Sequence, residues 1–184
     1  MADQVQIQRR EALKGAVANS PTVRLTPAPA ASRASLRAGP DAVAALSTAL
    51  GVSLPTRPKT SALANGRAAL WLGPDEWLLI GPEGTDFVGL AGKADALHAA
   101  VDISHRNVAI MVSGPGAADA INAGCPQDLS LAVFPVGACS RTVFGKIEVI
   151  VHRTEEDTFR VECWRSFSDY CFAMLREGAR DAAF

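Results

Sequence analysis

The sequence has little of the charge or apolar patterning that nucleic-acid-binding and membrane proteins use. Eighteen Lys and Arg residues face nineteen Asp and Glu residues, and no block of five or more basic residues could follow a phosphate backbone. No apolar run reaches the roughly 18 residues that a spanning helix needs. The N-terminal MADQVQ lacks the basic and apolar regions of a signal peptide. We therefore expect a cytoplasmic protein with no nucleic acid and no membrane among its partners.

Cysteine is also scarce, and its spacing excludes the commonest cysteine motifs. The chain has four, and no two of them form the CxxC pair that holds zinc or cycles a disulfide. We expect buried free thiols, since free cysteine is among the most buried residue types. Cys163 lies in a predicted strand and Cys171 in a predicted helix, and their spacing does not determine whether the two thiols meet.

The remaining composition predicts a folded protein. Of 184 residues, 48% are hydrophobic and 20% charged, close to globular averages, although aromatic residues reach only 6%. A chain of this length buries roughly 70% of its unfolded surface. Residues 1–20 are predicted to be a mobile segment. Residues 21–184 are predicted to form a single domain or two small lobes, at about 21–100 and 101–184.

Apolar spacing predicts four helices, at residues 41–51, 87–100, 117–123 and 166–178. In the first, Asp41 is the expected N-cap and Gly51 occupies the position of a left-handed C-terminal residue. In the last, Ser166 and Asp169 resemble a capping box, and the apolar period ends at Gly178.

Alternating and continuous apolar runs predict strands at residues 22–25, 34–37, 62–63, 68–72, 77–80, 101–103, 108–112, 141–144, 147–151 and 158–164. The first two are expected to be short edge strands. Asn65-Gly66 predicts a hairpin turn, and the run 77–80 predicts a strand covered on both faces. The order of the elements predicts an α+β fold with helices packed on a mostly antiparallel sheet.

Candidate catalytic groups are few. His105 follows Ser104 directly, but neighbouring residues of a strand point to opposite faces, which argues against a nucleophile and base. Asp102 and Ser104 do share a face, which favours a structural hydrogen-bond pair. The adjacent carboxylates Asp75 and Glu76 follow Gly-Pro, where a turn or cap is more typical than an acid/base pair.

Ligand motifs are equally weak. The turn at residues 113–116, SGPG, lacks the third glycine of a dinucleotide fingerprint and the lysine of a P-loop, so a tight turn before a helix is favoured over an anion site. The three histidines, His98, His105 and His152, have no second ligand at a metal-binding spacing.

Trp71 and Trp77 bracket the turn at Asp75, and tryptophan is typical of cores as well as of interface centres. Both interpretations are open for these two residues. Arg165 precedes the last helix, where it could bind a partner carboxylate or form a local cap or surface pair.

Five segments of the chain form a distinctive combination: residues 70–79 (LWLGPDEWLL), 101–106 (VDISHR), 125–129 (CPQDL), 139–142 (CSRT) and 164–170 (WRSFSDY). In this order they resemble one family, the gamma subunit of heterotetrameric sarcosine oxidase. The resemblance covers roughly residues 60–180. It also implies a fold similar to the folate-binding domain of aminomethyltransferases, although residues 93–98 (KADALH) lack that family's acidic Gly-Asp-rich loop.

The resemblance implies an oxidoreductase complex acting on CH-NH donors, with alpha, beta and delta subunits as partners. Such a complex oxidises sarcosine to glycine with FAD, FMN, NAD and tetrahydrofolate, and its zinc belongs to the delta chain. We expect these cofactors in the other subunits and no catalytic, cofactor-binding or metal residue in this chain. His105, Arg106, Arg165, Trp71 and Trp77 are the predicted partner contacts. An autonomous folate-dependent enzyme and a free-standing binding module are the alternatives.

Overall fold

The computed structural model describes residues 11–182, which form two antiparallel sheets and four α-helices. The six-stranded sheet has the order β1-β2-β8-β11-β10-β9, with strands at Ala18–Asn19, Arg24–Pro27, Asn107–Ser113, Thr158–Trp164, Ile147–Glu155 and Cys139–Phe144. The five-stranded sheet has the order β4-β5-β6-β3-β7, with strands at Ser61–Ala64, Arg67–Gly73, Glu76–Pro82, Ala31–Ala38 and His98–Asp102. The helices are α1 (Val43–Leu50), α2 (Phe87–Ala91), α3 (Ala117–Asn122) and α4 (Ser168–Asp181).

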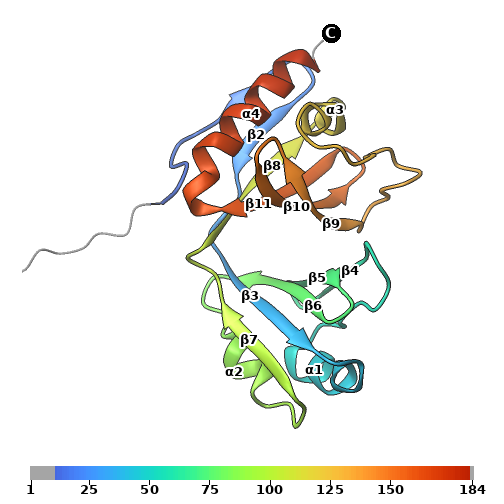
Figure 1. The fold of residues 1–184 in the computed structure, drawn as a ribbon. Coiled ribbons are helices and arrows are strands. Elements are labelled where there is room, and N and C mark those ends of the chain that lie inside the picture. Colours follow the sequence, from blue (N-terminus) through green and yellow to red (C-terminus); the bar gives the residue numbers. More distant parts are fainter. Residues whose placement is uncertain (1–10, 183–184) are drawn as a thin grey trace, which may run out of the picture.

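These elements stack as helix, sheet, sheet and helix (Figure 1). Helices α3 and α4 cover the outer face of the six-stranded sheet, and α1 and α2 cover the outer face of the five-stranded sheet. A third apolar cluster lies between the two sheets and includes Leu70, Leu78 and Ile150. The α+β class with helices on antiparallel strands is therefore confirmed, but the strands divide between two sheets.

The chain passes twice between the sheets. It leaves the six-stranded sheet after β2, builds the whole five-stranded sheet, and returns through residues 103–106 into β8. The strand β2, which pairs with β8, thus belongs to the sheet formed mainly by the C-terminal half. The division into one domain or two lobes stays a prediction. Of the predicted mobile segment, residues 1–10 lie outside the described residues.

Several local predictions are confirmed. Asn65 and Gly66 have φ values of 53° and 71° and join β4 to β5, as a two-residue hairpin turn requires. Gly51 ends α1 with a left-handed φ of 67°. In β6, residues 76–81 are all buried, so this strand is covered on both faces.

The predicted helix from 87 to 100 is wrong beyond α2. Residues 98–102 form strand β7, paired antiparallel with β3, and Leu97 is 93% exposed instead of lying on an apolar helical face. Backbone pairing with β3 replaces a helix that Gly89 and Gly92 weaken, each by about 1 kcal/mol relative to Ala. Tertiary pairing overrides the local apolar period here.

Three further predictions need correction. Asp41 lies within a 3₁₀ turn, Pro40–Ala42, and provides no side-chain cap for α1. The proposed capping box is absent, because Ser166 lies in a 3₁₀ turn, Arg165–Phe167, and α4 begins at Ser168 without a side-chain cap. The predicted edge strands are interior: β2 lies between β1 and β8, and β3 lies between β6 and β7.

The four cysteines are free and buried, as expected. Burial raises the pKa of Cys139 to about 12, so its reactive thiolate is not formed near neutral pH. A hydrogen bond with the Cys163 thiol, together with burial, raises the pKa of Cys171. The strand β11 and the helix α4 therefore bring these two thiols together.

Gly178 lies inside α4, although the sequence predicts that the helix ends there. A Cβ atom at this position would lie 2.3 Å from the carbonyl oxygen of Ala120 in α3 and 3.0 Å from the Cβ of Ala123. The glycine is thus needed for the close approach of two helices. A terminal glycine and a packing glycine look alike in the sequence, which explains the error.

Replacing Gly178 with Ala is expected to lower the free energy of unfolding by about 2 kcal/mol. Alanine favours a helix by about 1 kcal/mol, but crowding against the Ala120 backbone costs more than this gain. Urea denaturation monitored by circular dichroism measures the difference. The exposed neighbour variant Glu177→Ala should change stability by no more than about 0.5 kcal/mol, and a stabilised Gly178→Ala protein would contradict the packing explanation.

Candidate functional site

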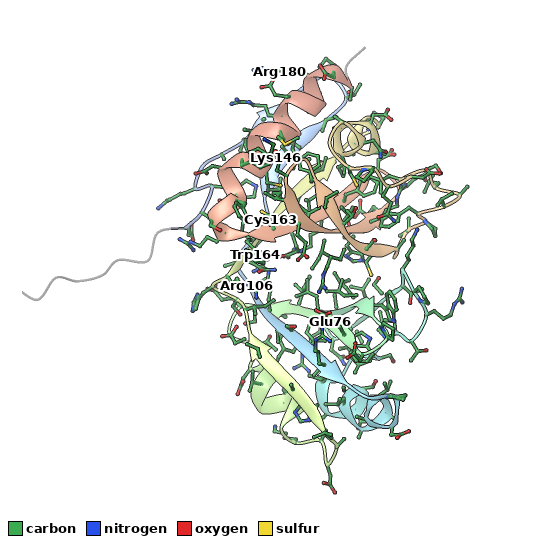
Figure 2. All side chains as sticks on the ribbon, viewed as in Figure 1. Glu76, Arg106, Lys146, Cys163, Trp164 and Arg180 are labelled. Carbon is green, nitrogen blue, oxygen red and sulfur yellow. The ribbon has the colours of Figure 1, made fainter. Side chains whose placement is uncertain are left out.

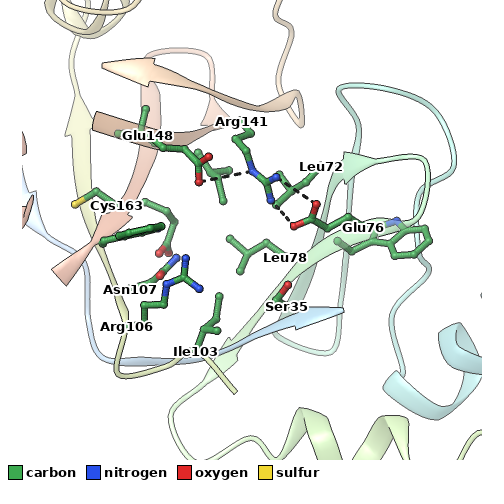
Figure 3. A pocket seen from close by; sticks show the side chains of 15 residues that line it. Ser35, Leu72, Glu76, Leu78, Ile103, Arg106, Asn107, Arg141, Glu148 and Cys163 are labelled. Carbon is green, nitrogen blue, oxygen red and sulfur yellow. Dashed lines mark hydrogen bonds and ion pairs between the residues drawn. The ribbon is translucent and has the colours of Figure 1, made fainter. Parts of the chain in front are cut away.

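A small cleft opens between the two sheets, next to the third apolar cluster (Figure 3). Its volume is about 70 Å³, and its polar lining includes Glu76, Arg106, Asn107, Arg141 and Glu148. These residues come from both sheets and from the connection 103–106.

Glu76 lies at the centre of one ion-pair group in this cleft. Its Oε2 accepts hydrogen bonds from Arg37 Nη2 at 2.9 Å and from Arg141 Nη1 at 3.2 Å, and its Oε1 accepts from Arg141 Nη2. The hydrogen bond to Glu76 raises the pKa of Arg141. Because Arg141 lies on β9 and Glu76 on β6, this group joins the two sheets. The neighbour Asp75 pairs with Arg37 at 3.1 Å, so both carboxylates hold the turn in place.

A second ion-pair group joins the sheets at a more buried position. Arg33 of β3 donates from Nε to Glu162 Oε2 of β11 at 2.8 Å, and Arg160 Nε donates to Glu162 Oε1 at 2.8 Å. The Arg33 side chain is 4% exposed and that of Glu162 is fully buried. Removal of one member would leave a buried charge without its partner.

The run 101–106 anchors Arg33. Ser104 donates its hydroxyl to Asp102 Oδ1 at 2.5 Å, and the Arg33 amide donates to Ser104 Oγ at 2.8 Å. The Ile103 amide donates to the Arg33 carbonyl at 2.9 Å. The predicted structural pair of Asp102 and Ser104 is confirmed, and its consequence is to hold the backbone of the arginine that bridges the sheets.

A serine and a histidine do meet, but at a place that sequence reasoning missed. Ser61 Oγ lies 3.1 Å from His152 Nε2, and the two residues are 91 positions apart. The Ser61 hydroxyl donates to the Gly137 carbonyl at 2.6 Å, so His152 Nε2–H must be the donor toward Ser61. A histidine that donates to the serine cannot accept its proton, so the pair lacks the arrangement that activates a nucleophile.

The environment of His152 keeps its ring neutral. It is 2% exposed, and burial together with the charge of Arg160 lowers its pKa to about 4, against a smaller opposing effect of Glu162. Arg160 is its direct cross-strand neighbour on β11, and Cys139 is its neighbour on β9. The signal for this contact is absent from the sequence because it arises from strands of different sheets.

Arg106 and Trp164 lie next to each other where the connection 103–106 meets the end of β11 (Figure 2). We call the exposed residues Arg106, Trp164 and Phe167 the aromatic surface. The guanidinium carbon of Arg106 lies 4.3 Å from the centre of the Trp164 ring, and the Trp164 and Phe167 rings stack at 6.0 Å. Trp164 is 39% and Phe167 40% exposed. Sequence reasoning selected Arg106 but missed both rings as partner contacts, although they belong to the run 164–170.

The other predicted contact residues differ in accessibility. His105 is exposed, and Arg165 is half-buried, with its amide donating to the Arg106 carbonyl at 2.7 Å. Trp71 is half-buried. Trp77 is 1% exposed and donates from Nε1 to the Pro55 carbonyl at 2.7 Å, which makes it a core residue and not a surface contact.

Two features are absent from the described residues, 11–182. No group of three or more His, Cys, Asp or Glu side chains is placed to hold a metal ion. None of the helices in this part of the chain is both long and apolar enough to span a membrane.

Comparisons with protein families and curated sequences agree with each other. The model of the sarcosine oxidase, gamma subunit family matches residues 35–181. A sarcosine oxidase subunit gamma of Arthrobacter sp is 38% identical over 124 residues, which are 64% of this chain and 60% of that relative. Another, of Corynebacterium sp. (strain P-1), is 33% identical over 167 residues, 88% of this chain and 82% of that relative.

Solved structures give the same result for the fold. A chain of the heterotetrameric sarcosine oxidase from Corynebacterium sp. U-96, in complex with pyrrole 2-carboxylate, superposes with a TM-score of 0.86 and 28% identity. The match covers 96% of this chain and 98% of that chain. The glycine cleavage system aminomethyltransferase T of Bartonella henselae matches with a TM-score of 0.66 and 19% identity, over 88% of this chain and 49% of that one. The fold relation to aminomethyltransferases is thus confirmed.

Proposed function

We propose, from the premise that this chain belongs to the sarcosine oxidase gamma subunit family, that it is a noncatalytic assembly subunit of a heterotetrameric sarcosine oxidase. In this proposal the cytoplasmic complex oxidatively demethylates sarcosine to glycine. The one-carbon unit passes to tetrahydrofolate or leaves as formaldehyde, and hydrogen peroxide is formed. The alpha, beta and delta subunits are the partners, and they hold FAD, FMN, NAD, tetrahydrofolate and zinc.

One observation carries the assembly role. This chain superposes over 96% of its length on one chain of a four-subunit enzyme, with a TM-score of 0.86. Nearly the whole chain therefore corresponds to a single subunit. A protein with this correspondence is expected to assemble with the same kinds of chains.

The noncatalytic part of the proposal is supported by the chemistry of the cleft between the sheets. Pockets for small molecules and cofactors measure about 300–1,000 Å³, whereas this cleft measures about 70 Å³. Glu76 and Glu162 are engaged by arginines, and Ser61 donates its proton to a carbonyl. These three groups are therefore engaged in structural contacts.

Co-expression tests the assembly role. We expect this chain to elute in size-exclusion chromatography together with the alpha, beta and delta chains and to purify without colour when expressed alone. Absorbance spectroscopy detects any flavin that the isolated chain binds. Elution as a separate peak in every co-expression would contradict the assembly role, and flavin in stoichiometric amount would contradict the noncatalytic role.

The fold relation to aminomethyltransferase T is the observation that favours the alternative, an autonomous folate-dependent enzyme. Calorimetric titration of the isolated chain with tetrahydrofolate separates the two functions. We expect no binding at micromolar concentrations. Tight binding would favour the folate enzyme, while neither binding nor assembly would favour a free-standing module.

A further inference from the structure

We propose that the aromatic surface of Arg106, Trp164 and Phe167 is the docking site for a partner subunit, which presents an Asp or Glu side chain to the Arg106 guanidinium. The proposal rests on the assembly role and deepens it by naming a surface and the chemistry of its partner.

The Arg106 guanidinium differs from those of several other arginines. Arg33, Arg37, Arg141 and Arg160 each pair with a carboxylate of this chain. Within residues 11–182, the Arg106 guanidinium has no carboxylate partner and lies 4.3 Å from the centre of the Trp164 ring. Its planar N–H donors are therefore available to a carboxylate, the group that guanidinium binds most specifically.

The backbone of Arg106 is held in place by this chain alone, before any partner binds. Its amide donates to the Ile103 carbonyl at 3.0 Å, and its carbonyl accepts from the Arg165 amide at 2.7 Å. The Trp164 ring supports the guanidinium from one side. A cation that is already oriented loses less conformational entropy when it binds, which favours affinity.

Two exposed aromatic rings lie beside Arg106. Trp164 and Phe167 leave 39% and 40% of their surface accessible and lie against each other with an interplanar angle of 23°. Tryptophan and arginine are the residue types most enriched where interface mutations have large effects. Both rings belong to the segment matched by the family model, residues 35–181. An apolar residue of the partner beside its carboxylate would cover them.

A second exposed apolar surface lies in the loop before β9 and includes Leu131, Val133 and Val136. Residues 131–136, LAVFPV, contain no charged side chain. This loop segment therefore does not indicate which chemical group of a partner would bind it, whereas the Arg106 guanidinium indicates a carboxylate.

Equilibrium binding of this chain to the purified complex of alpha, beta and delta chains tests the proposal. Arg106→Met keeps a long apolar side chain on Trp164 and removes the charge. We expect its dissociation constant to rise about 10- to 100-fold, as for loss of a charge-assisted pair. The dependence of binding on ionic strength should also become weaker. Phe167→Ala should weaken binding about 10-fold without changing the salt dependence.

Arg57→Met is the matched control, because Arg57 is an exposed arginine of the loop between α1 and β4. It should bind within about twofold of the unmodified chain. Circular dichroism verifies that each variant is folded. Binding of Arg106→Met equal to that of the control, with unchanged salt dependence, overturns the docking proposal alone. Failure of the unmodified chain to bind overturns the assembly role and the docking proposal together.

Discussion

Replacing Glu162 with Gln is expected to lower the free energy of unfolding by about 3–5 kcal/mol, the usual cost of breaking a buried ion pair. The carboxylate is fully buried and accepts hydrogen bonds from Arg33 and Arg160, each at 2.8 Å. A neutral amide of the same shape would leave two guanidinium groups close together without a compensating charge. The midpoint of thermal unfolding should fall by about 10 °C in a chain of this size.

Urea denaturation at pH 7.5 measures this effect, and two further variants test its cause. Glu148→Gln removes a carboxylate whose side chain is 51% exposed and which lies 3.9 Å from Arg141, so about 0.5 kcal/mol or less is expected. The double variant Arg33→Met with Glu162→Leu should be more stable than Glu162→Gln, because it leaves fewer unpaired buried charges. A loss below about 1 kcal/mol for Glu162→Gln would mean that the buried pair does not hold the sheets together.

Lowering the pH from 7.5 to 5 is expected to remove about 2 kcal/mol of stability through His152 alone. Its pKa is about 4 in the folded protein, below the ordinary histidine value of 6.5. Between these two values the unfolded chain binds a proton that the folded chain does not. Stability is therefore full above pH 6.5, falls as the pH decreases toward 4, and falls no further below it.

The variant His152→Gln should show a pH dependence of stability that is flatter by the same amount, since glutamine does not titrate. Chemical denaturation of both proteins at pH 7.5, 6 and 5 measures the two slopes. An unchanged slope in His152→Gln would show that burial does not hold this ring neutral.

Residues 101–106 show which contacts can be predicted from a residue pattern and which cannot. The Ser104 hydroxyl does donate to the Asp102 carboxylate, but strand alternation is not the reason, because β7 ends at Asp102 and Ser104 lies in the following turn. The rejection of Ser104 with His105 as nucleophile and base stays a prediction. Strand alternation had no means to find Ser61 beside His152, because the contact joins β4 to β10 across the two sheets.

Glycine and aromatic residues show a second limit. Asn65-Gly66 was interpreted correctly because a hairpin turn is local, whereas Gly178 was misinterpreted because its partner, Ala120, lies 58 positions away. The sequence leaves both a core and an interface position open for Trp71 and Trp77, and the structure places Trp77 in the core. The sequence does not identify Trp164 and Phe167 as partner contacts, because residue type alone does not predict whether a side chain is exposed.

Local residue patterns predict the α+β class, most strand positions and the free buried cysteines, and five short segments carry the resemblance to the sarcosine oxidase gamma family. These features depend on local preferences and on motifs, which act over a few residues. The two facing sheets, the bridge between Arg33 and Glu162, and the contact of Arg106 with Trp164 at the surface appear only in the folded chain. Such contacts are set by the packing of distant segments, and their energies depend on burial that no single segment specifies.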